Sequence, residues 1–250
     1  MHIIENNIHM ERWYNKLAIV TGADQNIGCI IADALVNKGL IVMGLAENID
    51  NVLKIRSELP TTLRHRLYPI RCDITKDDQV EKAFSYIQNT YGCIDMLINC
   101  AGILYGNILK NNGILTNENI KKSLDCNING IKNCTERAYI NMKNRMADGH
   151  IILIDSLLGN INTKLLSYSK DVITELTETY RNQFINDGIN NVKITCILSG
   201  PNETGTVSSN LIRQTLNYPI LKENEISNVI LYAVSTPPMV EIHEIILKTM

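Results

Sequence analysis

An excess of positive charge, a long apolar run and paired cysteine motifs are all missing from this chain of 250 residues. Its 24 lysines and arginines are outnumbered by 26 acidic residues, which gives a net charge of −2. Because nucleic acids and anionic membranes bind clusters of basic residues, neither is an expected partner. No apolar stretch approaches the roughly 20 residues that a helix needs to cross a bilayer, so we expect no membrane span.

The seven cysteines show no CxxC pair of the kind that holds zinc or forms a redox dithiol. Their number is odd and most lie in apolar segments, which indicates reduced core residues, a cytoplasmic protein and no metal site. They are Cys29, Cys72, Cys93, Cys100, Cys126, Cys134 and Cys196. The first nine residues, MHIIENNIH, carry no signal-peptide pattern, so we expect 1–9 to be a flexible extension and 10–250 to form one domain.

Short β-branched runs alternate with amphipathic stretches of helical length along the rest of the chain. This alternation predicts an α/β fold, a Rossmann-like doubly wound parallel sheet flanked by helices. The strands are expected at 16–22, 40–46, 65–73, 94–102, 150–156, 191–200 and 241–248. The helices are expected at 27–39, 49–59, 76–92, 118–146, 166–186 and 223–235. Ligands of such folds bind beyond the carboxyl ends of the strands, where the strand order reverses.

The segment TGADQNIG, Thr21 to Gly28, joins the first strand to an apolar helix. A glycine-containing loop in this position is typical of dinucleotide sites, because it presents the N-terminus of the helix to a pyrophosphate. Gly22 would permit the tight turn, and Gly28 would permit close packing of the helix.

This loop resembles the TGASSGIG of the short-chain dehydrogenase/reductase family, and further motifs follow in the order of that family. They are CDIT at 72–75, NCAG at 99–102, Asn127 in CNING and Ser156 in IDSLLG. Four other segments are similar to the farnesol dehydrogenase-like branch: MERW at 10–13, GHIIL at 149–153, ITELTETYR at 173–181 and STPPMVEIHEIILK at 235–248. The resemblance covers nearly the whole chain from Met10 onward.

The resemblance implies an NAD(P)-dependent oxidoreductase for hydrophobic alcohols or carbonyl compounds such as farnesol, assembled as a homodimer or homotetramer. It implies Ser156, Lys170 and Asn127 as catalytic residues. It implies that the dinucleotide is contacted by Gly22, Asn26, Ile27, Gly28, Asp73, Ile74, Asn99, Ala101, Gly102, Lys170 and Thr204. Asp73 has a second interpretation, as an acid favoured near the N-terminus of the next helix.

The nucleotide loop departs from the family pattern at two positions. Asn26 replaces the middle glycine, although asparagine tolerates a positive φ and the turn can persist. Asp24 stands where small residues usually approach the pyrophosphate, and it opposes binding if it points inward but not if it faces solvent. After the second strand, Glu47 would repel a 2′-phosphate, which favours NAD over NADP.

The catalytic helix departs from the pattern as well. In the family a tyrosine exchanges the proton and a lysine four residues later assists it, but Leu166 stands four residues before Lys170. Tyr168 is only two residues away, about 200° around a regular helix rather than about 40°. It is either a bystander or, if the first turn is irregular, re-aimed toward the site. Gly200 and Pro201 also reverse the usual Pro-Gly order, which puts the reach of Thr204 in question.

These departures lead to two hypotheses. In the first, the chain is a short-chain dehydrogenase/reductase scaffold with weak or lost catalysis, kept as a folded binding or oligomerising protein. In the second, it is an active NAD(P)-dependent enzyme that uses Ser156 or a re-aimed Tyr168 as proton donor.

Overall fold

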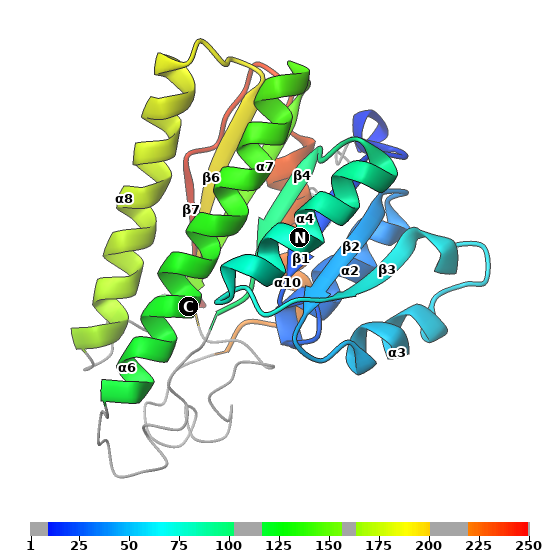
Figure 1. The fold of residues 1–250 in the computed structure, drawn as a ribbon, viewed down its shortest axis with the longest axis horizontal. Coiled ribbons are helices and arrows are strands. Elements are labelled where there is room, and N and C mark those ends of the chain that lie inside the picture. The colour runs from blue at the N-terminus through cyan, green and yellow to red at the C-terminus, as the bar shows by residue number, and fades with distance from the viewer. Residues whose placement is uncertain (1–9, 103–116, 157–163, 201–219, 250) are drawn as a thin grey trace.

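A seven-stranded sheet forms the centre of the computed structural model (Figure 1). The strand order is β3-β2-β1-β4-β5-β6-β7, and the paired strands run parallel. The strands are β1 Leu17–Thr21, β2 Ile41–Ala46, β3 Leu67–Arg71, β4 Met96–Asn99, β5 Gly149–Ser156, β6 Val192–Ser199 and β7 Glu244–Leu247. Because the order reverses between β1 and β4, the predicted doubly wound Rossmann-like fold is confirmed.

The structure describes residues 10–102, 117–156, 164–200 and 220–249, with the side chains of Asn26, Asn119, Ser156, Glu223 and residues 164–170 outside the description. The expected extension at 1–9 also lies outside the described residues. The helices are η1 Glu11–Trp13, α2 Asn26–Asn37, α3 Asp50–Glu58, η2 Arg64–Arg66, α4 Asp77–Tyr91, α6 Asn117–Leu124, η3 Asp125–Gly130, α7 Ile131–Arg145, α8 Lys164–Asn186 and α10 Glu223–Ser235. Of these, η1 and η2 are 3₁₀-helices and η3 is a π-helix.

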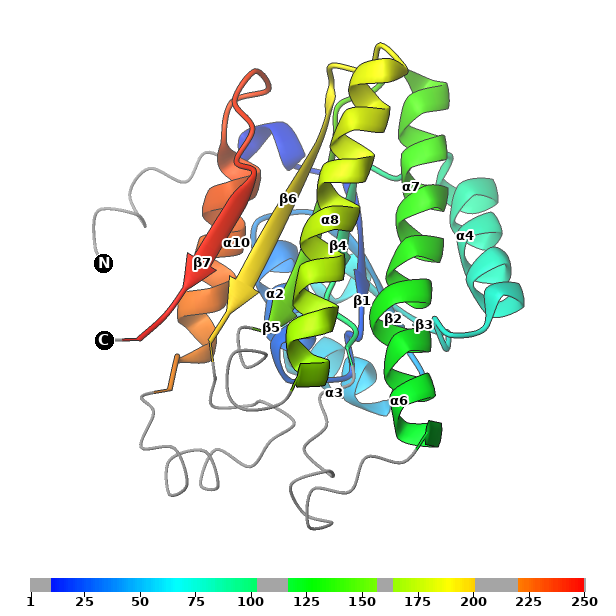
Figure 2. The same cartoon turned by 90° about the vertical axis from the view of Figure 1, so that its left-hand side faces the viewer.

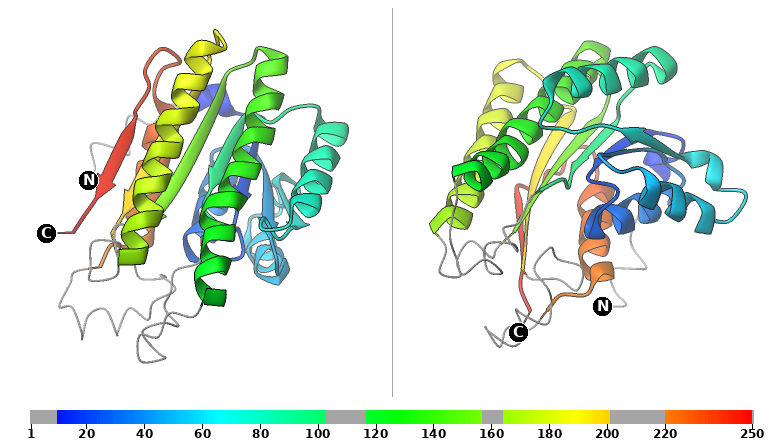
Figure 3. Two further views of the ribbon diagram at one scale, coloured as in Figure 1. Left: turned by 60° about the vertical axis from the view of Figure 1, so that its left-hand side comes forward. Right: turned by 60° about the horizontal axis from the view of Figure 1, so that its bottom comes forward.

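Three helices cover each face of the sheet. Helices α4, α7 and α8 lie side by side on one face, in teal, green and yellow, while α2, α3 and α10 cover the other (Figures 2 and 3). On the first face, the rings of Tyr139 and Phe184 stack 4.2 Å apart between α7 and α8. Two apolar layers therefore sandwich the sheet, as parallel sheets require.

Strands β1 and β6 are buried along their whole length and are mostly apolar, because both of their faces are covered. All five residues of β1 and all eight residues of β6 are buried. Such continuous apolar runs are typical of parallel strands covered on both faces, which explains why the sequence predicted these strands correctly.

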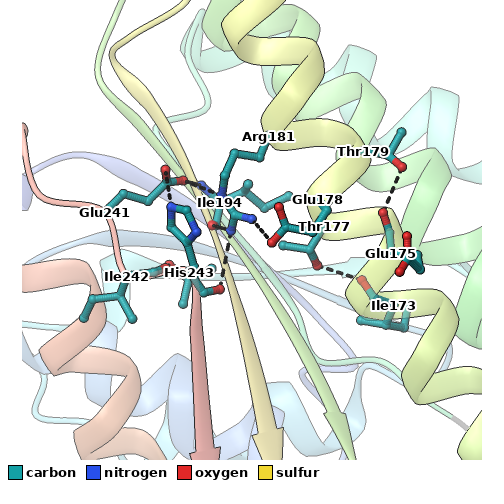
Figure 4. Close-up of polar contacts among 11 residues, drawn as sticks. Ile173, Glu175, Thr177, Glu178, Thr179, Arg181, Ile194, Glu241, Ile242 and His243 are labelled. Atoms are coloured by element: carbon teal, nitrogen blue, oxygen red, sulfur yellow. Dashed lines mark hydrogen bonds and ion pairs between the residues drawn. The ribbon is translucent and has the colours of Figure 1, made fainter.

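The last strand is shorter than the predicted range 241–248 because its first residues form other bonds. Arg181 of α8 donates hydrogen bonds to the carbonyl oxygens of Ile194 and His243 and pairs with Glu178 (Figure 4). Glu241 accepts the N–H of Ile194 at 2.9 Å and lies 3.6 Å from the Arg181 guanidinium. Side-chain bonds thus hold 241–243 against the sheet, and the strand ladder begins only at β7.

The predicted helix 118–146 is interrupted by a π-helical segment. Helix α6 continues into η3 and then into α7, with six residues of wider winding between two α-helical stretches. The apolar periodicity predicted one continuous helix, and only the Asn and Gly residues of CNING, which weaken a helical pattern, hint at the change.

All seven cysteines are free thiols, and four of them are buried. Burial raises the pKa of Cys72 to about 11 and that of Cys196 to about 12. Both thiols are therefore protonated at neutral pH and behave as small apolar core residues rather than nucleophiles.

Candidate cofactor and catalytic site

The carboxyl ends of four neighbouring strands, β1, β4, β5 and β6, meet at one edge of the sheet and bring predicted site residues there. Thr21 at the end of β1 pairs in register with Asn99 at the end of β4. Ser156 ends β5, where it pairs with Ser199 of β6. This edge is the one at which open α/β sheets bind ligands.

Two glycines shape the loop between β1 and α2. Gly22 has a φ of +65°, and a Cβ atom at this position would lie 2.8 Å from the Cα of Ala101. A Cβ atom on Gly28 would lie 2.1 Å from the carbonyl oxygen of Gly22. The helix therefore packs directly on the turn, and larger side chains are excluded from both positions by backbone atoms.

Asn26 and Ile27 are the first residues of α2. Among the described residues other than glycine, only Asn15 and Met146 have a positive φ, so Asn26 needs no left-handed conformation. The loss of the family's middle glycine is thus compatible with the turn. The first N–H groups of a helix have no partners within the helix, which leaves those of α2 available to an anion.

The hydroxyl oxygen of Thr21 fixes the segment that follows β4. It accepts the N–H groups of Cys100 and Ala101, both at 3.1 Å. The amide of Asn99 is fully buried, and its Nδ2 donates to the hydroxyl of Thr135 at 2.9 Å. Among the described residues, a Cβ atom on Gly102 would find only Asn127 Oδ1 within 4 Å, at 3.6 Å, so these residues leave space beside this glycine.

Asp24 points toward the end of β2. Its half-buried carboxylate accepts hydrogen bonds from the backbone N–H groups of Asn48 and of Asp24 itself. Burial raises the pKa of Asp24, and these bonds partly offset that rise. The sequence left two orientations open for this carboxylate, inward toward the phosphate or outward to solvent. In the structure it points instead toward the backbone of Asn48, at the end of β2.

Glu47 follows β2 and lies near two other carboxylates. Its pKa is raised by partial burial and by the negative charges of Asp73 and Asp24. Three acids therefore approach one another at the ends of β1, β2 and β3. Sequence reasoning treated them separately, because only the strand order places these three loops together.

Asp73 and Ile74 connect the end of β3 to the helices. Asp73 Oδ1 accepts the N–H and the hydroxyl of Thr75, at 2.9 and 2.7 Å, and forms a local turn before α4. Ile74 is buried, and a Cβ atom on Gly130 would lie 2.7 Å from its Cδ1. The π-helical segment η3 therefore packs tightly on the loop that carries Asp73.

Asn127 lies in η3 and is buried, with Nδ2 donating to the hydroxyl of Ser123 at 3.2 Å. The position of Gly102 relative to Asn127 Oδ1 shows that this side chain faces the segment after β4. π-helical turns are often found at functional sites, because they re-aim a side chain within a helix. The one hint in the sequence was CNING, where Asn and Gly weaken an otherwise helical pattern.

For Leu166, Tyr168 and the predicted catalytic residue Lys170, the structure describes the backbone and not the side chains. Leu166, Tyr168 and Lys170 all lie within α8, which begins at Lys164. The backbone is therefore already helical two residues before Leu166, and the irregular first turn that could have re-aimed Tyr168 is not present at 166–170. Gly200 follows β6, and its N–H donates to the carbonyl oxygen of Leu247 at 2.9 Å. Pro201 and Thr204 lie outside the described residues.

The described residues hold no group of three or more His, Cys, Asp or Glu side chains that could bind a metal ion. Within the same residues, no helix is long and apolar enough to cross a membrane. The features present at this edge are instead those that a dinucleotide requires: a tight glycine turn, a free helix N-terminus, and space beside Gly102.

Comparison with known proteins agrees with this geometry. The sequence profile described as short chain dehydrogenase matches residues 16–214. Farnesol dehydrogenase of Aedes aegypti is 34% identical over 244 residues, covering 96% of this chain and 98% of the relative. Dehydrogenase/reductase SDR family member 11 of Homo sapiens is 31% identical over 250 residues, covering 94% and 95%.

Solved structures of similar fold include a short-chain type dehydrogenase/reductase from Mycobacterium marinum. Its TM-score is 0.80 at 21% identity, with 98% of this chain and 97% of that chain covered. An alcohol dehydrogenase from Thermococcus sibiricus, complexed with 5-hydroxy-NADP, has a TM-score of 0.77 at 22% identity and covers 93% and 96%.

The chain therefore belongs to the short-chain dehydrogenase/reductase family of oxidoreductases. Within that family it is similar to farnesol dehydrogenase over nearly its whole length. The resemblance identified from the sequence motifs is confirmed at both levels.

Proposed function

We propose that this protein is a dinucleotide-binding short-chain dehydrogenase/reductase scaffold in which turnover of hydrophobic alcohols is weak or lost. The observation that carries the proposal is the position of Leu166, four residues before Lys170 on a backbone that is helical from Lys164 onward. Residues four apart share one face of a helix, so the side chain next to Lys170 is apolar. Leucine cannot exchange a proton with the substrate oxygen.

A bound nicotinamide dinucleotide would accept or supply a hydride, and the protein must then move a proton at the substrate oxygen. General acid–base catalysis typically contributes roughly 10²- to 10⁴-fold to a rate. Ser156 and Asn127 remain in the sequence, and we propose that with Lys170 they orient the substrate and the cofactor ribose. Without a phenol beside Lys170, the step that fails is the transfer of the proton.

The second candidate is an active enzyme that uses Ser156 or Tyr168 as proton donor. The regular backbone of α8 argues against Tyr168, because a residue two positions from Lys170 lies about 200° around the helix. Ser156 is the more plausible donor, since it ends β5 at the same edge as Asn99.

We propose NAD rather than NADP as the dinucleotide. The residues around the turn at Gly22 fit a pyrophosphate, while the carboxylates of Asp24, Glu47 and Asp73 act on one another at the neighbouring strand ends. A 2′-phosphate at the end of β2 would meet this negative charge, whereas a ribose diol could donate hydrogen bonds to it.

The substrate class is proposed from the similarity to farnesol dehydrogenase, and the location as cytoplasmic from the free cysteines. Helices α7 and α8 lie side by side on the outer surface and expose Ile140 and Ile185. We propose that these helices form a homodimer or homotetramer interface. Sedimentation at micromolar concentration tests this proposal, and a monomer would contradict it.

Two measurements test the main proposal. Thermal denaturation with millimolar NAD or NADP should raise the melting temperature, because a ligand that binds only the native state stabilises it. Product formation from farnesol-like alcohols should be absent or very slow. Turnover that Ser156→Ala abolishes would overturn the proposal and support the second candidate.

A further inference from the structure

A small pocket opens at the amino ends of the strands, on the edge of the sheet opposite to the cofactor site. It has a volume of about 210 Å³ and is lined by Arg12, Trp13, Lys16, Ala147 and Asp148. These residues come from η1, the start of β1 and the segment before β5. Pockets for drug-sized ligands start at about 300 Å³, so this one suits a smaller molecule.

Two contacts hold the side chain of Arg12 in place at the pocket. Its guanidinium lies 4.5 Å from the centroid of the Trp13 ring, and its Nη2 donates to the carbonyl oxygen of Val234 at 3.1 Å. The indole Nε1 of Trp13 donates to the same oxygen at 2.7 Å. Among the described residues, the buried Nε of Arg12 has no hydrogen-bond partner. A fixed cation thus lines the pocket, while its Nε is covered.

A buried lysine, Lys193, adds positive charge near the pocket, where its charge acts on that of Arg12. Lys193 is buried, and its ammonium donates to Thr236 Oγ1 and to the carbonyl oxygens of Pro237 and Val240 at 2.8–3.0 Å. These acceptors are neutral, so they satisfy the ammonium without cancelling its charge. Burial and the nearby charge of Arg12 lower the pKa of Lys193 to about 8, so it is still mostly protonated at neutral pH.

The acids near this edge compensate only part of that charge. Asp148 lines the pocket and is exposed, and its charge acts on both Arg12 and Lys193. Glu241 also acts on Lys193 but accepts the N–H of Ile194 and lies near Arg181. Lys16 is exposed at the pocket rim and adds a further cation.

We propose that this pocket binds a small oxyanion, attracted by the charges of Arg12 and Lys16 beside Trp13. Guanidinium and ammonium groups both form charge-assisted hydrogen bonds with carboxylate and phosphate oxygens. The site is separate from the proposed cofactor site, because it lies at the amino ends of the strands. Occupation would tie η1 to the segment before β5.

Fluorescence of Trp13 gives a local readout, since it is the only tryptophan in the chain. The full-length protein is titrated with inorganic phosphate and, separately, with acetate, each against sodium chloride at equal ionic strength. We expect a saturable fluorescence change with at least one oxyanion; the anion that causes it identifies the phosphate or carboxylate source. A response equal to that of chloride, or none, overturns the proposal.

Three single substitutions locate the binding. Lys16→Gln at an exposed position should weaken apparent affinity about tenfold, as expected for a lost charged hydrogen bond. Asp148→Asn should strengthen it about threefold, because it removes the repelling carboxylate. The matched control Lys54→Gln, an exposed lysine on α3, should leave affinity unchanged. If Lys16→Gln and Lys54→Gln behave alike, or if Asp148→Asn weakens binding, the pocket is not the site.

Discussion

Gly28 packs so closely on Gly22 that a Cβ atom on Gly28 would lie 2.1 Å from the Gly22 carbonyl oxygen. The contact is between two backbones, so no side chain can move aside to relieve it. The first turn of α2 is thereby fixed relative to the end of β1. This places the N–H groups at the start of α2 next to the tight turn, where a pyrophosphate would bind.

Gly28→Ala should therefore destabilise the protein strongly. Overpacking of a tight contact costs about 1–3 kcal/mol, and for a chain of this size each kcal/mol lowers the melting temperature by about 2–4 °C. Thermal denaturation followed by circular dichroism measures the change. A melting temperature equal to that of the wild type would show that the turn and α2 can separate at little cost.

Gly102→Ala is expected to leave the stability nearly unchanged and to weaken NAD binding. Among the described residues its Cβ atom would meet only Asn127 Oδ1, at an ordinary contact distance of 3.6 Å, so the melting temperature should change by less than about 2 °C. Because the methyl group would fill space beside the proposed cofactor, NAD affinity measured by calorimetry should fall. Unchanged affinity would mean that Gly102 does not line the cofactor site.

Leu166→Tyr should produce or increase turnover of hydrophobic alcohols, because it restores a phenol on the helix face of Lys170. Leu166→Phe is the matched control, since it adds the ring without the hydroxyl and should stay inactive. Tyr168→Phe should leave any activity of the wild type unchanged. The rates are followed by absorbance of the reduced dinucleotide. Equal activity of the Tyr and Phe variants would exclude proton transfer by the new hydroxyl.

The fold could be predicted from sequence because its cause is local and repeated. Residues 17–21 and 192–199 are mostly apolar and all buried, since both faces of each strand are covered. The orientation of Asp24 could not be predicted, because its hydrogen-bond partner Asn48 lies on another strand's loop. The π-segment at Asp125–Gly130 was missed because a wider turn leaves the apolar pattern nearly unchanged.

Asp24→Asn with Glu47→Gln should increase NADP affinity relative to NAD by roughly threefold to tenfold. The expected gain is small because exposed charges interact by less than about 1 kcal/mol each. Asparagine at 24 can still accept the N–H of Asn48, so the loop should be retained. An unchanged ratio of dissociation constants would show that these acids do not face the 2′ position.

The ratio of the dissociation constants of NAD and NADP should depend on pH. The pKa values of Asp24 and Glu47 are raised, so both carboxylates become neutral at a higher pH than ordinary acids do. Lowering the pH into the range in which Asp24 and Glu47 take up protons should therefore narrow the preference for NAD. The narrowing should be smaller in the double variant, which lacks both of these carboxylates. If the preference for NAD falls equally in the wild type and in the double variant, Asp24 and Glu47 do not face the 2′ position.

His150 should make the protein sensitive to mild acid. Complete burial and the charges of Lys193 and Arg12 lower its pKa well below 6.5, and its Nε2 bonds with Thr195 Oγ1 at 2.9 Å. Below pH 6.5 the unfolded chain binds a proton here that the folded chain does not, so stability falls as the pH decreases. Urea unfolding between pH 7.5 and 5 should show a steeper loss in the wild type than in His150→Asn.

The bond between Trp13 and Val234 has a consequence for the order in which the chain matures during synthesis. Strands β1 to β4 are complete by residue 99, so half of the sheet can pair early on the ribosome. Trp13, however, finds its acceptor only 221 residues later. We expect nascent chains that end before α10 to keep this indole exposed to water, so that its fluorescence maximum lies at a longer wavelength. Addition of α10 should shift the maximum to a shorter wavelength.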